Sequence, residues 1–131
     1  MNEFEWFKTL VDIDDEISNI DSQKKIYELE LKRWSSYHGG DLANKSTYLA
    51  SMRRQNRIEK IMISLNGRKE ELEEQRKEAV DIINDFKGLE HEILRLRYIK
   101  GYKLTQIAEE LGYSYQHIKN THSRVMKDIR A

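Results

Sequence analysis

LTQIAEELGYS (residues 104–114) and the YQHIKN that follows it (residues 115–120) have the pattern of a helix-turn-helix. The first segment is a short helix with one apolar face, and Gly112 at its end allows the left-handed backbone of a tight turn. We expect Tyr113 to pack back into the core and Ser114 to cap the second helix by accepting a backbone N–H. A helix-turn-helix presents its second helix to the major groove of DNA. The pattern therefore predicts DNA recognition by this part of the chain.

Three helices are predicted in the C-terminal third, and we expect them to form one domain over residues 89–131. They cover residues 90–100, 104–111 and 115–130, and Gly88, Gly101 and Gly112 mark the places where helices end in a left-handed residue. Ala108 is expected where two helices cross closely, because a larger side chain there would separate them. The inner face of the third helix carries Ile118, Val125 and Ile129.

The outward positions of the third helix follow from its inner face. If Ile118 points inward, the residues that point outward are Tyr115, Gln116, Lys119, Asn120 and Ser123. Gln and Asn can make paired hydrogen bonds to adenine, and Lys can donate to guanine or phosphate. Arg124 and Lys127 lie further along the helix and are expected to meet phosphates. We therefore predict that these seven residues contact double-stranded DNA.

The charge distribution favours DNA binding at this end but limits its strength. The chain is neutral overall, yet residues 1–88 hold 15 Lys and Arg against 18 Asp and Glu, whereas residues 89–131 hold 8 against 5. The C-terminal part thus has a net charge of +3. So small a surplus gives a monomer few phosphate contacts and weak, salt-sensitive binding. We therefore expect a homo-oligomer, with a dimer favoured, or a second protein partner.

Two long helices are predicted before the helix-turn-helix, which makes the fold class all-α. The first, over residues 3–34, has the alternating four- and three-residue steps of a coiled-coil seam through Trp6, Leu10, Ile13, Ile17, Ile20, Lys24, Tyr27, Leu31 and Trp34. The second, over residues 46–87, repeats every seven residues through Ile58, Leu65, Leu72, Ala79 and Phe86, with Ile61, Arg68, Gln75 and Ile82 at intermediate positions. Residues 1–87 are predicted to form an antiparallel hairpin through a 35–47 loop, for oligomerisation or partner docking. Alternatively, Asn66 and Gly67 divide the second helix, since glycine is unfavourable there.

Composition and motifs argue against an enzyme, a metal protein and a membrane protein. Cysteine is absent, which excludes disulfides and thiolate metal sites and fits a reducing cytoplasm. No apolar run is long enough to span a membrane, and the start of the chain lacks the basic residues of a secretory signal. His91 begins a zinc-protease-like pattern, but Arg95 takes the place of the second histidine, so His91 is predicted to be an ordinary helix residue. No catalytic residue, cofactor or metal is expected.

LRLRYIKG (residues 94–101) and IAEELG (residues 107–112) resemble region 4 of the sigma-70 family. That region reads the promoter −35 element and docks on the flap of RNA polymerase. The resemblance implies that bases are met from Tyr115, Gln116, Lys119 and Asn120. Two residues depart from the family pattern: Lys103 replaces the usual Ser or Thr cap, and His122 replaces an apolar residue. The resemblance covers about a third of the chain and includes no counterpart of region 2, so the chain is not a complete sigma factor.

Taken whole, a helical hairpin before a region-4-like end is similar to small Gram-positive phage and prophage proteins near the ArpU-type and RinA-type regulators. This similarity implies a sequence-specific transcriptional regulator that acts with host RNA polymerase in the bacterial cytoplasm. Two other functions stay open. A small terminase subunit also joins a DNA-binding end to an oligomerising hairpin, and the region-4-like end could bind polymerase without DNA.

Overall fold

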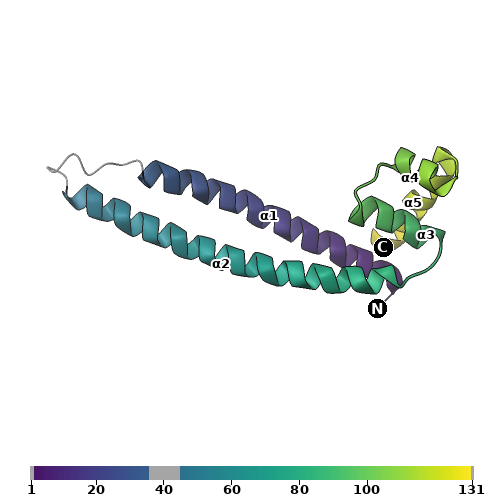
Figure 1. The fold of residues 1–131 in the computed structure, drawn as a ribbon, viewed down its shortest axis with the longest axis horizontal. Coiled ribbons are helices and arrows are strands. Elements are labelled where there is room, and N and C mark those ends of the chain that lie inside the picture. Colours follow the sequence, from purple (N-terminus) through teal and green to yellow (C-terminus); the bar gives the residue numbers. More distant parts are fainter. Residues whose placement is uncertain (1, 36–44, 131) are drawn as a thin grey trace. The chain divides into compact units, whose positions relative to one another are not determined.

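The computed structural model describes residues 2–35 and 45–130, and the regular elements in them are all helical (Figure 1). In chain order they are α1 (Glu3–Ser35), α2 (Lys45–Asn84), α3 (Leu89–Leu94), the π-helical η2 (Arg95–Ile99), α4 (Leu104–Leu111) and α5 (Tyr115–Arg130). The predicted all-α class is confirmed. Residues 36–44, which make up most of the expected 35–47 loop, lie outside the described residues.

Packing divides the chain into two compact units. The first consists of the residues up to Asp14 together with those from Glu74 onward, and the second consists of residues 15–73. The first unit thus adds the start of α1 and the end of α2 to the helices of the helix-turn-helix. This division by packing differs from the boundary predicted at residues 87–89. The functions expected of residues 1–87 and 89–131 stay predictions.

The second unit is a pair of antiparallel helices. Their direction follows from the ion pairs, because residues further along α1 meet residues earlier in α2: Glu16 pairs with Arg68 at 2.9 Å, and Glu30 pairs with Arg54. Among the described residues of this unit, the buried apolar ones are Ile20, Ile58 and Leu72. So few buried side chains leave the helix pair dependent on contacts along its edges as well.

Among the interactions of the described residues, the following ion pairs between α1 and α2 share one polarity, with the acid on α1 and the base on α2. They are Glu16–Arg68, Glu30–Arg54 and Asp21–Lys69 in the second unit and Asp14–Arg76 in the first. In the first two pairs, the acids are 14 residues apart along α1 and the bases are 14 residues apart along α2. In the last two pairs, both separations are seven residues, as a seven-residue repeat requires. Exposed ion pairs contribute only about 0.2–1 kcal/mol each. Their main effect is therefore to favour one register and one direction of the helix pair.

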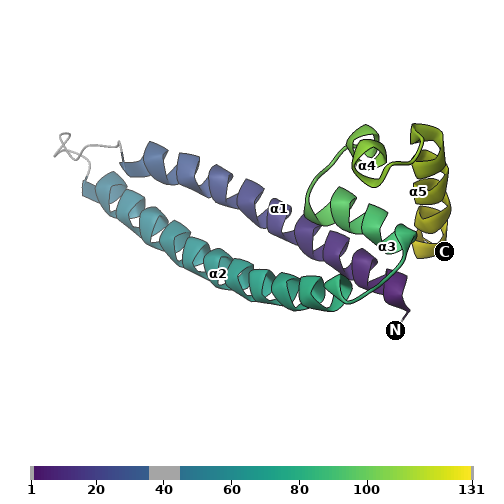
Figure 2. The same cartoon turned by 45° about the vertical axis from the view of Figure 1, so that its right-hand side comes forward.

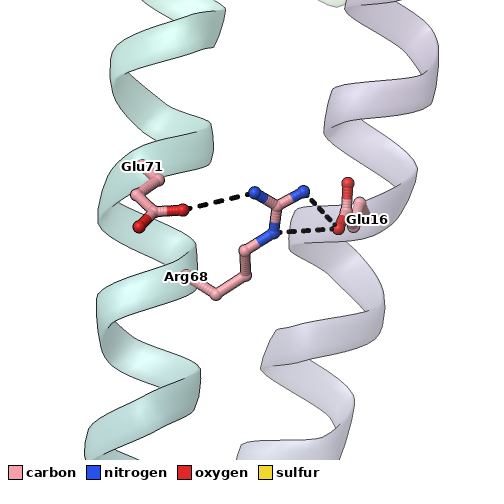
Figure 3. Close-up of polar contacts among 3 residues, drawn as sticks. All are labelled: Glu16, Arg68 and Glu71. Carbon is pink, nitrogen blue, oxygen red and sulfur yellow. Dashed lines mark hydrogen bonds and ion pairs between the residues drawn. The ribbon is translucent and has the colours of Figure 1, made fainter.

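Figure 3 shows one of these contacts in detail. The Arg68 guanidinium donates to Glu16 of α1 through Nε at 3.1 Å and Nη2 at 2.9 Å, and to Glu71 of its own helix through Nη1 at 3.3 Å. The hydrogen bonds to these carboxylates raise the pKa of Arg68 above its ordinary value. Likewise, the hydrogen bond from Lys69 holds the pKa of Asp21 below its ordinary value. Both shifts favour the charged forms that the ion pairs need.

The intermediate seam positions of α2 differ from the prediction by one residue. Ile83 is fully buried whereas Ile82 is 36% exposed. Seven and fourteen residues before Ile83 stand Arg76 and Lys69, whose side chains are less exposed than that of Arg68. Long basic side chains can bury their stems while their charged ends reach carboxylates. The seam therefore passes through charged residues, and for this reason the apolar pattern indicated the wrong positions.

α2 continues without a break through Asn66 and Gly67, so the alternative of two shorter helices is wrong. Glycine in a helix interior costs about 1 kcal/mol relative to alanine, and the packing of residues such as Leu72 outweighs that cost. A Cβ added at Gly67 would meet no atom within 4 Å. The glycine is therefore required neither by packing nor by backbone conformation within the described residues.

Replacing Gly67 with alanine is expected to raise the free energy of unfolding by about 0.5–1 kcal/mol, because alanine loses less backbone freedom on folding. Urea denaturation followed by circular dichroism measures this change. Gly88 is the matched control: its φ of 113° and ψ of 161° lie in a region open almost only to glycine, so Gly88→Ala should lower stability by about 1–3 kcal/mol. A destabilising Gly67→Ala would contradict the open surroundings assigned to this position.

The first unit has two apolar cores that share α3 and α5. One cluster joins Phe7 and Leu10 of α1, Ile83 of α2, Leu94 of α3 and Val125 of α5. The other joins Ile93, Ile107, Ala108 and Ile118. The consecutive residues Ile93 and Leu94 thus enter different cores, and both views show the start of α1 beside α3 (Figures 1 and 2).

Candidate nucleic-acid interface

The turn between α4 and α5 has the predicted geometry. Gly112 is left-handed, with φ 75° and ψ 27°, and its N–H donates to the carbonyl oxygen of Ala108 at 3.0 Å. Ser114 Oγ accepts the backbone N–H of His117 at 3.1 Å, which confirms the helix cap. Ala108 is buried, as expected for a residue between closely packed helices. These contacts fix the start of α5 relative to α4.

Tyr113 does not pack into the core, and this part of the prediction is wrong. Its side chain is 46% exposed and stacks on the ring of His117, with ring centroids 5.2 Å apart. The space beneath the turn is filled by the cluster that contains Ile107 and Ile118. The tyrosine ring therefore covers the first turn of α5 from outside.

The two departures from the region 4 pattern are both compensated. At the start of α4, Gln106 Oε1 accepts the backbone N–H of Lys103 at 2.8 Å, which supplies one half of a capping box without a hydroxyl. His122 is half-buried, and its Nε2 lies 3.1 Å from the hydroxyl of Tyr98. The same hydroxyl donates to Met126 Sδ at 3.3 Å. A polar contact therefore takes the place of an apolar one on this part of α5.

The two faces of α5 separate as predicted. Ile118 and Val125 are buried, Ile129 is half-buried, and the hydroxyl-bearing Thr121 is also buried. The exposed residues include all seven that were predicted to contact DNA: Tyr115, Gln116, Lys119, Asn120, Ser123, Arg124 and Lys127. Their exposure is what DNA contact requires, and the contact itself stays a prediction.

Three of these exposed residues are positioned by contacts that the sequence did not reveal. Gln116 Nε2 donates to Asn120 Oδ1 at 2.9 Å, so the two amides one turn apart form a joined pair. Arg124 Nη2 donates to Glu90 Oε1 of α3 at 2.8 Å. The arginine side chain is 65% exposed, so this ion pair is weak and a DNA phosphate can replace its carboxylate.

Arg95 and His91 hold α3 and η2 to the long helices. The guanidinium of Arg95 donates to the carbonyl oxygens of Ile83 at 3.2 Å and Phe86 at 2.6 Å, which satisfies backbone groups at the end of α2. His91 is buried, stacks on Phe4 with ring centroids 4.7 Å apart, and places Nε2 2.8 Å from a carboxylate oxygen of Glu3. His91 thus lies in a helix, as predicted, and it is in addition a packing residue of the core.

Residues 87–131 match the family model of Sigma-70, region 4. This match covers about a third of the chain and includes α3, η2, α4 and α5. No curated protein and no solved structure matches the chain. The chain thus carries a sigma-70 region 4-like helix-turn-helix, a module of the DNA-binding and non-catalytic kind. Among the described residues, no helix combines the length and apolar character needed to cross a membrane.

Proposed function

We propose that this protein is a sequence-specific DNA-binding regulator of phage or prophage transcription that acts with RNA polymerase in a bacterial host. The main support is the exposed polar face of α5 within a region 4-like module. In a helix-turn-helix, residues near the start of the second helix meet base edges while later ones meet the backbone. The amide pair of Gln116 and Asn120 suits adenine, and Lys119 suits guanine or phosphate.

A selection from the source genome tests this function. Sheared genomic DNA is incubated with the full chain at physiological salt, and the bound fragments are recovered and sequenced. The proposal predicts enrichment of a short motif upstream of a transcription unit. Enrichment at a packaging start would replace it with a terminase-like function. Failure to enrich any fragment, with or without RNA polymerase, would contradict sequence-specific binding.

The protein is further proposed to act as a dimer. The second unit leaves large apolar side chains exposed on its helices: Ile26 and Leu29 of α1 at 62% and 70%, and Ile63 of α2 at 71%. Self-association would remove such side chains from water and double the phosphate contacts per complex. Sedimentation should therefore give twice the 15.7 kDa of the single chain, and a mass of one chain at micromolar concentration would contradict this part of the proposal.

A further inference from the structure

The basic residues of the long helices are concentrated around the end of the second unit that is furthest along α1. Residues 24–35 and 47–60 contain eight Lys and Arg against three Asp and Glu. The remaining stretches, residues 2–23 and 61–87, contain six against fourteen. The excess of five positive charges is larger than the excess of three in residues 89–131. A protein whose second unit served only to pair two helices would not need this segregation.

Three of these bases form a stripe along α2. Arg53, Arg57 and Lys60 are spaced by four and three residues, which places them on one face of the helix, and all three are exposed. The same line continues in exposed small residues: Ala50 before the stripe, and Ser64 and Gly67 after it. From Ala50 to Gly67 this line contains no acidic side chain, and the exposed apolar residues Leu49 and Ile63 lie beside it.

The ion pairs of the second unit do not use this basic stripe. Arg54, Arg68 and Lys69 pair with carboxylates of α1. In the part of the chain that the structure describes, no ion pair involves Arg53, Arg57 or Lys60. The stripe is therefore positive charge that the fold itself does not neutralise.

We propose that the basic stripe binds the phosphate backbone of double-stranded DNA, as a second contact surface in addition to that of α5. At 1.5 Å per residue the stripe is about 10 Å long, which matches the rise of about three nucleotides along the axis of the DNA helix. The small residues on the same line let the DNA backbone approach α2 closely. DNA is the acidic partner that we favour over an anionic lipid surface, because the same chain carries a region 4-like helix-turn-helix.

This inference rests on the proposed DNA-binding function and explains how a module with few positive charges holds its site. Each phosphate neutralised by Lys or Arg adds affinity that does not depend on sequence and that falls with salt. The stripe thus supplies affinity, whereas α5 supplies sequence preference. The two surfaces make separable contributions that mutation can distinguish.

The test compares two full-length variants that each lose two positive charges. Arg53→Gln/Arg57→Gln removes most of the stripe, and Lys8→Gln/Lys77→Gln removes two exposed charges of the first unit. Binding to a long duplex of mixed sequence is measured between about 50 and 200 mM salt. Because each lost phosphate contact lowers the slope of log Kd against log salt by about 0.9, the stripe variant should lower it by about 1.8. The control variant should leave the slope at the wild-type value, and thermal melts check that both variants fold.

An unchanged slope in the stripe variant, or an equal fall in the control, would overturn the proposal. Loss of binding to phosphatidylserine vesicles with an unchanged DNA slope would assign the stripe to a membrane instead. If the stripe variant lowers the salt slope but the wild type shows no sequence preference, DNA binding by the stripe would be supported and the proposed sequence-specific regulation would be overturned. Absence of DNA binding at low salt would overturn both.

Discussion

Leu10→Ala is expected to lower the free energy of unfolding of the first unit by about 2–5 kcal/mol, because a fully buried leucine leaves a cavity. Leu10 lies in α1, yet it packs in one cluster with Leu94 of α3 and Val125 of α5. The start of α1 is therefore part of the core that supports the helix-turn-helix. Native-state hydrogen exchange measures the effect, and the amides of α3 and α5 should lose protection together with those of α1.

Lys8→Ala is the control for this experiment, since it changes an exposed side chain of the same helix two residues before Leu10. Its effect should stay within about 0.5 kcal/mol. A Leu10→Ala variant in which α1 loses protection while α3 and α5 keep theirs would show that residues 89–131 fold independently. That result would favour the boundary at residues 87–89 over the division by packing.

Asn120→Ala is expected to weaken binding to the preferred DNA site by about 5- to 150-fold, which corresponds to the 1–3 kcal/mol of a paired amide contact to a base. The same change removes the acceptor for Gln116, so it affects both amides of the pair. Lys119→Ala should weaken binding more evenly across sequences and lower the salt slope by about 1. Competition binding with the preferred site and a scrambled duplex separates the two effects.

Asn19→Ala controls for loss of an exposed asparagine from a helix, because Asn19 lies in α1 and outside the region 4-like module. It should leave affinity and sequence preference unchanged. Since Asn120 is also exposed, circular dichroism should find all three variants folded. If Asn120→Ala, Lys119→Ala and wild type bind the preferred site with equal affinity, the prediction that this face of α5 recognises bases would be wrong.

The sequence predicts the candidate site well where local pattern decides the structure. The bounds of α4 and α5, the left-handed Gly112, the cap by Ser114 and the inward Ile118 all depend on residues within one or two turns of each other. Such contacts have characteristic residue types and spacings. The exposure of the predicted DNA-binding residues follows directly from the burial of Ile118.

The sequence fails where residues far apart in the chain decide the structure. The sequence does not indicate that Ile93 and Leu94 enter different cores, because the core of Leu94 is made with Leu10, which precedes it by more than 80 residues. The burial of His91 likewise depends on Phe4 and Glu3. Neither contact has a periodic signal in the sequence. The one-residue error in the seam of α2 has a different cause, because Lys69 and Arg76 occupy positions where apolar residues are the usual signal.

The most direct test of the central claim, that the exposed face of α5 reads DNA sequence, is the genomic selection repeated in parallel with wild type and Asn120→Ala. The account predicts that wild type enriches a short motif and that the variant loses this enrichment or shifts it to a different base at one position. Recovery of the same motif with equal enrichment by both proteins would contradict the claim.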